Sequence, residues 1–247
     1  MTVPTEYNVI GGLIGLGPDI LLDVLSEIRL VPNAVQFIGS CKKTLQLINH
    51  SRFYGIIESL NYPIEIHNPD PTDIEFADID GVQKKITKKQ TKPNTISLTQ
   101  VIDQRVWTME VEFQNAGNGT GAVGIVRDTY KIPDDANPIY QPHNQHIVQY
   151  GGKSKSSGWV KYNGNEVSGN VEFIDNQIIK LQLNTITGTL IFFVDGIQQP
   201  IFVSGINEKV RFIIYLRYSE SSCIIRSLKR LSSPTSGHVT NEKSIIW

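Results

Sequence analysis

The sequence has 247 residues, 40% of them hydrophobic and 9% aromatic, and its 23 Lys and Arg residues balance 24 Asp and Glu residues. This length suits one large domain or a main domain with a small second module, and the apolar fraction can fill a core, which excludes a wholly disordered chain. A formal net charge of -1 excludes the basic excess that is typical of nucleic-acid binders.

The two cysteines, Cys41 and Cys223, lie far apart in the sequence. They form no disulfide framework, and neither has a second Cys or a His at metal-ligand spacing. We therefore expect reduced thiols in a cytoplasmic or nuclear protein that is not secreted. The start of the chain lacks a basic region, and the apolar stretch 9–25 is interrupted by glycines, Pro18 and two aspartates. We expect neither a signal peptide nor a membrane span.

Residues 1–62 have the apolar spacing of helices. The first predicted helix follows Pro18, and the second follows an N-cap at Asn33 and runs for about four turns to Ile48. A third short helix follows Ser51. These helices form an N-terminal hairpin module that is too small for a robust core of its own.

Charge is segregated by sign in residues 63–94. Six acidic residues without a basic one occupy positions 65–80, and five lysines without an acidic residue follow at positions 84–92. We interpret this segment as a charged linker or as a solvated hairpin around Asp80-Gly81. The acidic run largely cancels the field of the lysines, which disfavours a nucleic-acid or membrane patch.

Residues 95–231 have the period of β-strands. Apolar and polar residues alternate in Trp107–Phe113, in Ile179–Asn184 and in 210–217, with hairpin turns at 163–164 and 195–196 and a long irregular loop over 128–146. Short strands with no long helix between them predict an antiparallel β-sandwich. We place Trp107 and Trp159 in its core and interpret 232–247 as a flexible tail, whose last three residues can dock.

These strands resemble the SPRY domain family. The residues that carry the resemblance are Trp107–Phe113, Gly121–Ile125, Gly158-Trp159 before Asn163-Gly164, and Ile179–Asn184 with Gly188–Gly196. The match covers about residues 95–230 and departs from the family at Asn176-Gln177 and at Arg211–Ile214, which are framework positions. The resemblance implies a mainly β, concanavalin-like antiparallel sandwich that binds protein ligands without catalysis.

The N-terminal helices are similar to an F-box. Residues 16–26 resemble the opening of that family, with Gly17 separating the usual Leu-Pro pair, and Ser40–Lys43 resemble a second family motif. The resemblance implies docking to a Skp-type adaptor of cullin–RING ubiquitin ligases. The positions that would meet the adaptor are Pro18, Ile20, Leu21 and Leu25. The alternative is a purely structural helical cap of the sandwich.

The SPRY resemblance also implies that loops at one end of the sandwich bind the ligand. The corresponding loops are 115–120, 127–146, 151–158 and 217–222. Their candidate ligand-binding residues are Arg127, Asp128, Tyr130, Tyr140, Tyr150, Arg217 and Tyr218. Tyr and Arg are enriched in interface hot spots. Alternatively, some of these tyrosines close the ends of the core.

Three patterns of residues have an enzymatic or cofactor interpretation, and each is weaker than a structural one. Glu110 and Glu112 share a strand face, as the paired carboxylates of retaining glycosidases can, but solvated residues on a polar face are the simpler interpretation. His143 and His146 lack further metal ligands. The glycines of 11–17 lack the Lys-Ser/Thr ending of a phosphate loop. We therefore expect no metal, no cofactor and no catalysis.

The predicted function is that of an interaction adaptor, with partners limited to a protein or peptide ligand and a Skp-type adaptor, and without nucleic acid or membrane. One alternative is a plain SPRY interaction protein with structural helices. Another is a sandwich that binds or hydrolyses carbohydrate through Glu110 and Glu112.

Overall fold

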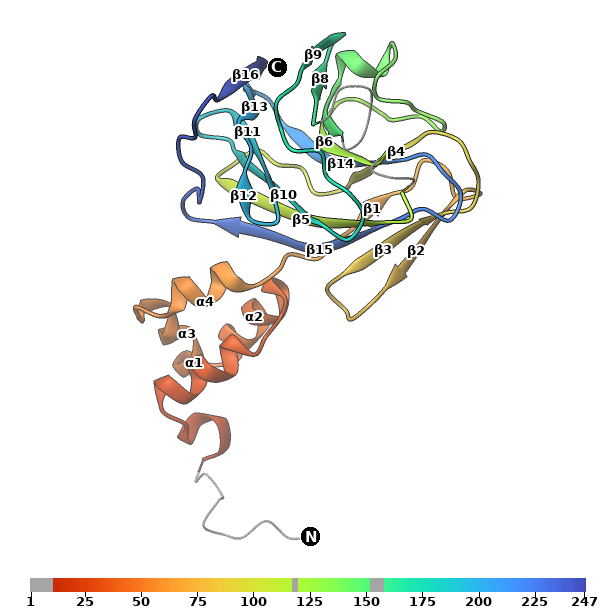
Figure 1. Cartoon of the computed structure of the whole chain (residues 1–247). Coiled ribbons are helices and arrows are strands. Elements are labelled where there is room, and N and C mark those ends of the chain that lie inside the picture. Colours follow the sequence, from red (N-terminus) through yellow and green to blue (C-terminus); the bar gives the residue numbers. More distant parts are fainter. Residues whose placement is uncertain (1–10, 117–119, 152–157) are drawn as a thin grey trace. The chain divides into compact units, whose positions relative to one another are not determined.

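The chain divides into two compact units in the computed structural model (Figure 1), which describes residues 11–116, 120–151 and 158–247. Met1–Pro63 form a helical unit and Ile64–Trp247 form a β-rich unit. The helices of the first unit are α1 (Pro18–Ser26), α2 (Val31–Ile38), α3 (Lys42–Leu45) and α4 (Phe53–Ser59), with 3-10 turns at Gly12–Gly15 and Gln46–Asn49. Parts of the predicted loops, 117–119 and 152–157, lie outside the described residues.

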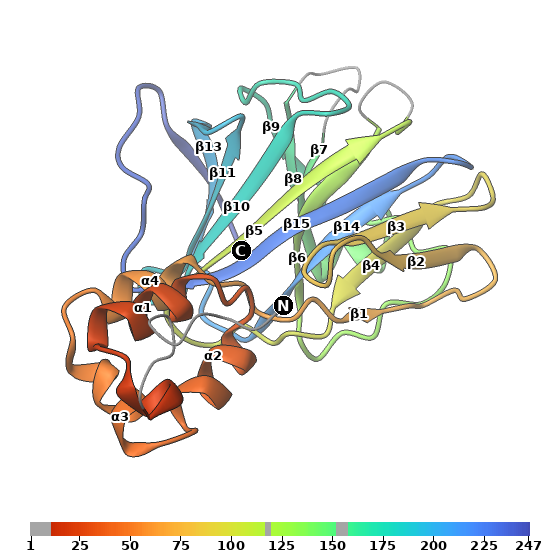
Figure 2. The same ribbon diagram turned by 90° about the horizontal axis from the view of Figure 1, so that it is seen from below.

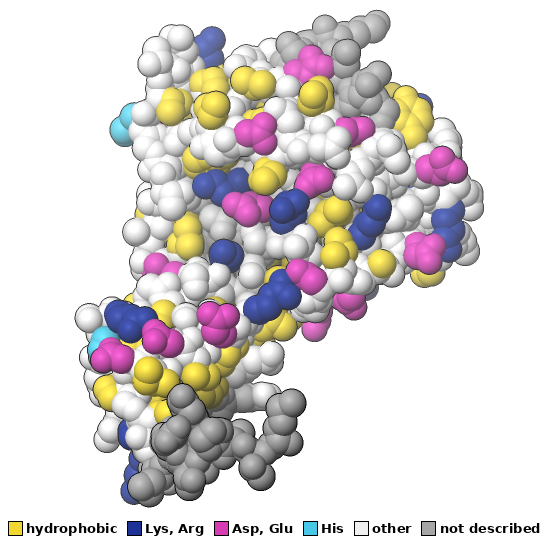
Figure 3. Space-filling model, turned by 60° about the horizontal axis from the view of Figure 1, so that its bottom comes forward, with side chains coloured by type: hydrophobic (Ala, Val, Ile, Leu, Met, Phe, Trp, Pro, Cys, Tyr) yellow, Lys and Arg dark blue, Asp and Glu magenta, His cyan; other side chains and the backbone are white. Residues whose placement is uncertain are grey.

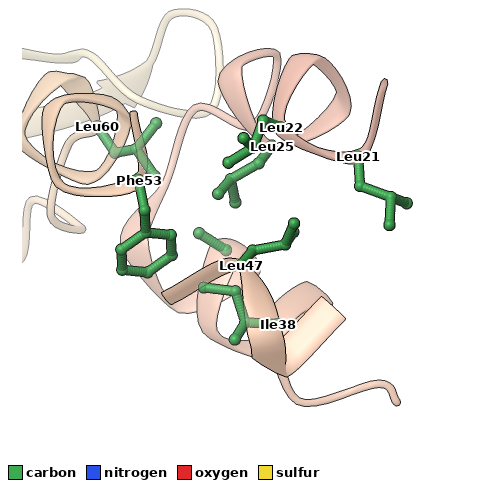
Figure 4. Close-up of a cluster of buried hydrophobic side chains, with 8 residues drawn as sticks. Leu21, Leu22, Leu25, Ile38, Leu47, Phe53 and Leu60 are labelled. Atoms are coloured by element: carbon green, nitrogen blue, oxygen red, sulfur yellow. The ribbon is translucent and has the colours of Figure 1, made fainter. Parts of the chain in front are cut away.

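The helical unit has an apolar core of its own, drawn in Figure 4. Its buried side chains are Leu21, Leu22, Leu25, Ala34, Ile38, Leu47, Phe53 and Leu60. Full burial of one Leu-sized side chain contributes about 1.5–3 kcal/mol. Leu21 and Leu25, predicted to meet an adaptor, are completely buried in this core. The prediction that both side chains lie on a docking surface therefore needs correction.

The second predicted helix is broken in the structure into α2 and α3. Helix α2 begins at Val31, before the predicted N-cap Asn33, and ends at a C-cap on Gly39. Thr44 explains the break, because its hydroxyl accepts a hydrogen bond from the Cys41 backbone N–H (3.2 Å) and lies 2.9 Å from the carbonyl oxygen of Ile38. This capping arrangement starts a new helix at Lys42.

The β-rich unit is a sandwich of two sheets, as the sequence predicted. The first sheet has seven strands in the order β1-β4-β14-β6-β7-β8-β9, and all of its pairs are antiparallel. Its strands are β1 (Ile66–His67), β4 (Asn94–Leu98), β14 (Val210–Leu216), β6 (Ala122–Arg127), β7 (Ile147–Gly151), β8 (Val160–Tyr162) and β9 (Asn165–Val167).

The second sheet has nine strands in the order β16-β13-β11-β10-β5-β15-β3-β2, with β12 pairing to β11. Its strands are β2 (Ile74–Asp78), β3 (Lys84–Lys88), β5 (Val106–Gln114), β10 (Ile178–Asn184), β11 (Thr189–Val194), β12 (Ile197–Gln198), β13 (Ile201–Ser204), β15 (Ser222–Leu231) and β16 (Lys243–Ile246). Figure 2 shows β10, β5 and β15 side by side in this sheet. Its pairs are antiparallel except β13–β16, which is parallel.

An aromatic and aliphatic core fills the sandwich. Tyr150 packs its ring against Phe173 and Phe192 with centroid distances of 5.1 and 5.0 Å. Trp107 and Trp159, placed in the core from the sequence, are 5% and 8% exposed, which confirms that prediction.

The charged segment 63–94 is part of the sandwich and not a linker. It contributes β1 and the first residue of β4 to one sheet and the β2–β3 hairpin to the other. The hairpin alternative was the better interpretation, because residues 79–83 form the turn around Asp80-Gly81. The acidic block and the lysine block lie opposite each other because the strands are antiparallel, so that Asp78 pairs with Lys84 (2.8 Å) and Glu75 with Lys89 (3.5 Å).

One ion pair of this hairpin, Asp73 with Lys88, is completely buried. The Asp73 carboxylate also accepts hydrogen bonds from the Asn94 side-chain amide (2.6 Å) and from the backbone N–H groups of Lys89 (3.1 Å) and Gln90 (2.7 Å). Burial lowers the pKa of Lys88, while the neighbouring Asp73 carboxylate favours the charged amine. A buried charge is tolerated when it is paired and hydrogen-bonded in this way.

The tail 232–247 is also bound to the sandwich. Lys243–Ile246 form β16, and Ile245 is 5% exposed. Before this strand, the Gln182 side chain donates to the Ser236 hydroxyl (2.6 Å) and accepts from the Thr235 N–H (2.9 Å). The expectation of a flexible tail overlooked these partners, which are distant in sequence.

We predict that Asp73→Ala destabilises the chain by about 3–5 kcal/mol, because it leaves the Lys88 amine buried without a counter-charge. Denaturant unfolding measures the change. Asp78→Ala is the matched control, since the pair of Asp78 with Lys84 is at the surface. Loss of such a pair lowers the free energy of unfolding by about 0–1 kcal/mol. Equal losses for the two variants would contradict the special role of Asp73.

Candidate functional site

The long segment 128–146 covers one face of the seven-stranded sheet. Side chains alternate along a strand, so that Arg211, Ile213 and Tyr215 share one face of β14. Ile213 lies in an apolar cluster with Ile132 and Ala136 of the segment, to which Val126 and Ile147 also belong. The segment is therefore packed against the sheet although it has little regular structure.

Arg211 fixes the first part of this segment. Its guanidinium donates to the carbonyl oxygen of Tyr130 (2.7 Å) and to the hydroxyl of Ser97 (2.7 Å), and it forms an ion pair with Asp128 (3.4 Å). A guanidinium with several partners holds its contacts in one geometry. The predicted ligand-binding residue Asp128 is thus engaged within the chain.

Strand β4 fixes the middle of the segment. The Thr95 hydroxyl donates to the carbonyl oxygen of Ala136 (2.9 Å), and the Asp135 N–H donates to the Asn94 side-chain oxygen (3.1 Å). Lys92 bridges the carboxylates of Asp70 (2.5 Å) and Asp135 (2.9 Å). The hydrogen bond from Lys92 holds the pKa of Asp70 well below its usual range.

Tyr130 contacts both His143 and His146, the two histidines that the sequence offered as metal ligands. Its hydroxyl lies 2.7 Å from Nδ1 of His143, and its ring stacks on His146 at 4.2 Å between centroids. Burial and the neighbouring His146 lower the pKa of His143. Within the described residues no group of three or more His, Cys, Asp or Glu side chains could hold a metal ion. These histidines order the segment through Tyr130.

A surface pocket of about 320 Å³ lies where the segment approaches the β14–β15 turn. It is lined by Pro93, Asp135, Asn137, Tyr140, Gln141, His143 and Arg217. Tyr140 is 63% exposed, and the neighbouring Tyr218 is 38% exposed. Burial raises the pKa of Tyr215 to about 12, and Arg217, Tyr218 and Tyr140 lie close enough to influence it further. Tyr140 and Arg217 thus line one hollow, and the Arg217 guanidinium lies 5.9 Å from the ring centroid of Tyr218.

The structure divides the predicted ligand-binding residues between two ends of the sheet. Arg127 pairs with Val210 at the start of β14, whereas Arg217 follows its end. The six intervening residue steps correspond to about 20 Å. One end of the sheet carries Tyr140, Arg217 and Tyr218, and the other end carries Arg127 and Asp128. The predicted ligand-binding residues therefore do not form the single surface that was expected.

Two further predicted ligand-binding residues, Tyr150 and Arg127, have their partners inside the chain. Tyr150 is fully buried and its hydroxyl donates to the carbonyl oxygen of Val171, as in the alternative in which tyrosines close the core. Arg127 forms an ion pair with Glu208, donates to the Tyr162 hydroxyl (2.9 Å) and lies over the Trp247 ring at 4.9 Å.

The paired carboxylates of β5 are engaged by the neighbouring strand β15. Glu112 forms an ion pair with Arg226 (2.5 Å), and Glu110 accepts a hydrogen bond from the Ser227 hydroxyl (3.1 Å). Both side chains therefore have partners within the chain, and they are half-buried, whereas the simpler interpretation of the sequence expected solvated residues. Figure 3 shows basic and acidic side chains intermixed over the visible face of the molecule.

A second hollow, of about 270 Å³, lies within the helical unit at the start of α1. It is lined by Pro18, Leu21, Lys43, Gln46, Leu47, Asn49 and His50. Ile20, in the first turn of α1 with Pro18, is 50% exposed. Pro18 and Ile20 are therefore the predicted adaptor-docking residues that are accessible at the surface.

Sequence reasoning missed Pro93, Asp135 and Asn137 as pocket residues. Pro93 belonged to the supposed linker, and Asp135 and Asn137 lie in the predicted loop 127–146 but were not among its candidate ligand-binding residues. For Pro93, the charge pattern of the preceding segment was the available signal. An acidic block followed by lysines across an Asp-Gly turn is typical of a hairpin whose strands pair, and such a hairpin would have placed Pro93 in the sandwich.

Comparisons with known proteins identify no family for this chain. No family model matches the sequence, and no curated protein matches it. The chain is similar to the PSpry domain of TRIM65 (TM-score 0.49, 11% identity, 66% of this chain and 91% of that chain) and to the SPRY domain of human HERC1 (0.48, 13%, 67% and 99%). It is also similar to stonustoxin (0.47, 14%), of which it covers 27%, with 67% of this chain matched. Among the described residues, no helix is long and apolar enough to cross a membrane.

Proposed function

We propose that this chain is a non-enzymatic interaction adaptor whose sandwich binds a protein or peptide ligand at the pocket between segment 128–146 and the β14–β15 turn. The observation that carries this proposal is that the exposed Tyr140 lines this pocket together with Arg217, whose guanidinium lies 5.9 Å from the ring centroid of the exposed Tyr218. The sequence resemblance of about residues 95–230 to SPRY domains supports the same function.

The chemistry of this surface suits a peptide. Tyrosine rings offer large contact areas at low entropic cost, and an Arg guanidinium offers several donors to the carbonyl or carboxylate groups of a ligand. The segment that presents Tyr140 is held by β4, by Arg211 and by the apolar cluster around Ile213. A preordered surface loses less entropy on binding.

The catalytic alternative receives no support from this pocket. Asp135 is paired with Lys92, and the Nδ1 atom of His143 is occupied by the Tyr130 hydroxyl. A general base needs a free proton-accepting atom directed at the substrate. The same holds for Glu112, whose carboxylate is paired with Arg226.

We further propose that the helical unit links this ligand to a cullin–RING ubiquitin ligase through a Skp-type adaptor. Pro18 and Ile20 supply the exposed apolar contacts, beside the hollow at the start of α1. Joining two binding modules in one chain raises the effective concentration of one partner near the other. The F-box resemblance of residues 16–26 supports this role.

Photo-crosslinking tests the sandwich surface. A photoreactive amino acid at position 140 of the full chain is expected to crosslink a protein ligand in cells, whereas the same amino acid at Ile186, which is 81% exposed on the β10–β11 turn, is not. Arg217→Ala should then weaken the captured complex by about tenfold, as loss of a hot-spot residue does. Equal capture at positions 140 and 186, or an unchanged affinity of Arg217→Ala, would argue against this surface.

Immunoprecipitation tests the ligase role. Ile20→Asp should abolish recovery of a Skp-type adaptor and leave the fold intact, because Ile20 is at the surface. Val35→Asp is the matched control, since Val35 is 61% exposed on α2 of the same unit. Leu21→Asp is unsuitable, because it would place a charge in the core. Failure to recover any such adaptor with the wild-type chain would remove the ligase role.

A further inference from the structure

One edge of the nine-stranded sheet is formed by β16, a strand from the end of the described chain. Strand β16 pairs with β13 in parallel, with Ile245 opposite Val203 and Ser204 opposite Ile246. Ile245 is 5% exposed and Ile246 is 66% exposed. The strand thus inserts one of these isoleucines into the sandwich and presents the other to solvent.

Trp247 follows this strand and lies in a polar and aromatic cradle. Its ring stacks on Tyr162 at 4.9 Å between centroids with an interplanar angle of 18°. The Arg127 guanidinium lies over the same ring at 4.9 Å, and the indole N–H donates to Glu208 (2.8 Å). The Trp247 backbone N–H donates to the carbonyl oxygen of Ser204 (2.9 Å), which continues the pairing of the strand.

The cradle has internal contacts that do not need Trp247. Arg127 forms an ion pair with Glu208 and donates to the Tyr162 hydroxyl (2.9 Å). These three residues come from β6, from β8 and from the turn between β13 and β14. The cradle can therefore keep its shape when the indole leaves.

The connection that leads into β16 is exposed over most of its length. Among residues 232–242, only Ser236 and Val239 are half-buried and the others are exposed. Its attachment depends on the Gln182 and Gln198 side chains, which hydrogen-bond residues 235–237. Few buried apolar contacts and many exposed hydrogen bonds are typical of elements that open locally.

We propose that the β13 edge and the Arg127–Tyr162–Glu208 cradle form a second peptide-binding site, specific for an extended segment of a partner protein with the pattern Ile-x-Trp, bound parallel to β13. The chain's own residues 243–247 occupy this site and show its specificity. Strand addition at a sheet edge supplies backbone hydrogen bonds, and the two side-chain positions supply selectivity. Release of the intramolecular strand controls access for the partner.

A labelled peptide with the sequence of residues 238–247 tests this proposal on the full chain. Ile245→Asp should expel β16 and open the site, so that the variant binds the peptide at least about tenfold more tightly than the wild-type chain, in which the tethered strand competes. Ile246→Asp is the matched control, because this side chain is already exposed. It should behave like the wild-type chain.

Changes in the peptide itself test the specificity without altering the protein. Replacement of the residue equivalent to Trp247 by Ala should abolish binding to Ile245→Asp, and replacement of the residue equivalent to Ile246 by Ala should leave it unchanged. Circular dichroism must show a folded Ile245→Asp chain, and Trp247→Ala serves as the opening variant if it does not.

Two results would overturn the proposal. A folded variant with an empty β13 edge that does not bind the peptide would show that β16 is only structural. Dimerisation of the wild-type chain in light scattering, with release by the peptide, would assign the site to a second copy of the chain and not to a partner. The crosslinking test at position 140 is independent of both results, because Tyr140 lies outside this site.

Discussion

The buried carboxylate of Asp73 is the contact on which the arrangement of the sandwich surface depends. It neutralises Lys88 and binds the Asn94 side chain, and so joins the β2–β3 hairpin to β4 of the other sheet. Asn94 in turn binds the Asp135 N–H at the pocket, while the Lys88 backbone exchanges hydrogen bonds with Ser221 and Glu220 of the β14–β15 turn. Both sides of the candidate binding surface are thereby connected to one buried charge. Because such a charge is costly without its partners, the surrounding segments are held in one arrangement.

The sandwich itself could be predicted from the sequence, because its central strands have one buried face and alternate clearly, as in Trp107–Phe113. The charged segment 63–94 could not be placed with the same rule. Asp and Lys are almost never fully buried, so their presence indicated a solvated linker, whereas the pairing of Asp73 with Lys88 depends on the register of the hairpin. The break at Gly39 escaped prediction for a related reason. Apolar spacing continues across it, and the capping contacts of the buried Thr44 appear only in the folded unit.

For the candidate site too, the sequence indicates which types of residue are present in the loops but not which other strands and loops they contact. Tyrosine and arginine in the loops predicted an interaction surface, which stays a prediction, although Tyr140 and Arg217 do line one pocket and Tyr218 lies beside Arg217. Sequence could not show that Tyr150 faces the core or that Arg127 is covered by Trp247, which lies 120 positions later in the chain. An arginine in a loop and an arginine in an internal cradle have the same local sequence signal. The distinction depends on which strands are neighbours.

Hydrogen–deuterium exchange of Asp73→Asn tests the central claim, that the buried charge positions the binding surface, most directly. This variant keeps the size of the side chain and removes its charge. We expect faster exchange in 133–140 and 217–221, with unchanged protection in the distant β10–β11 hairpin. An even increase throughout the sandwich, or unchanged exchange in 133–140 and 217–221, would contradict it.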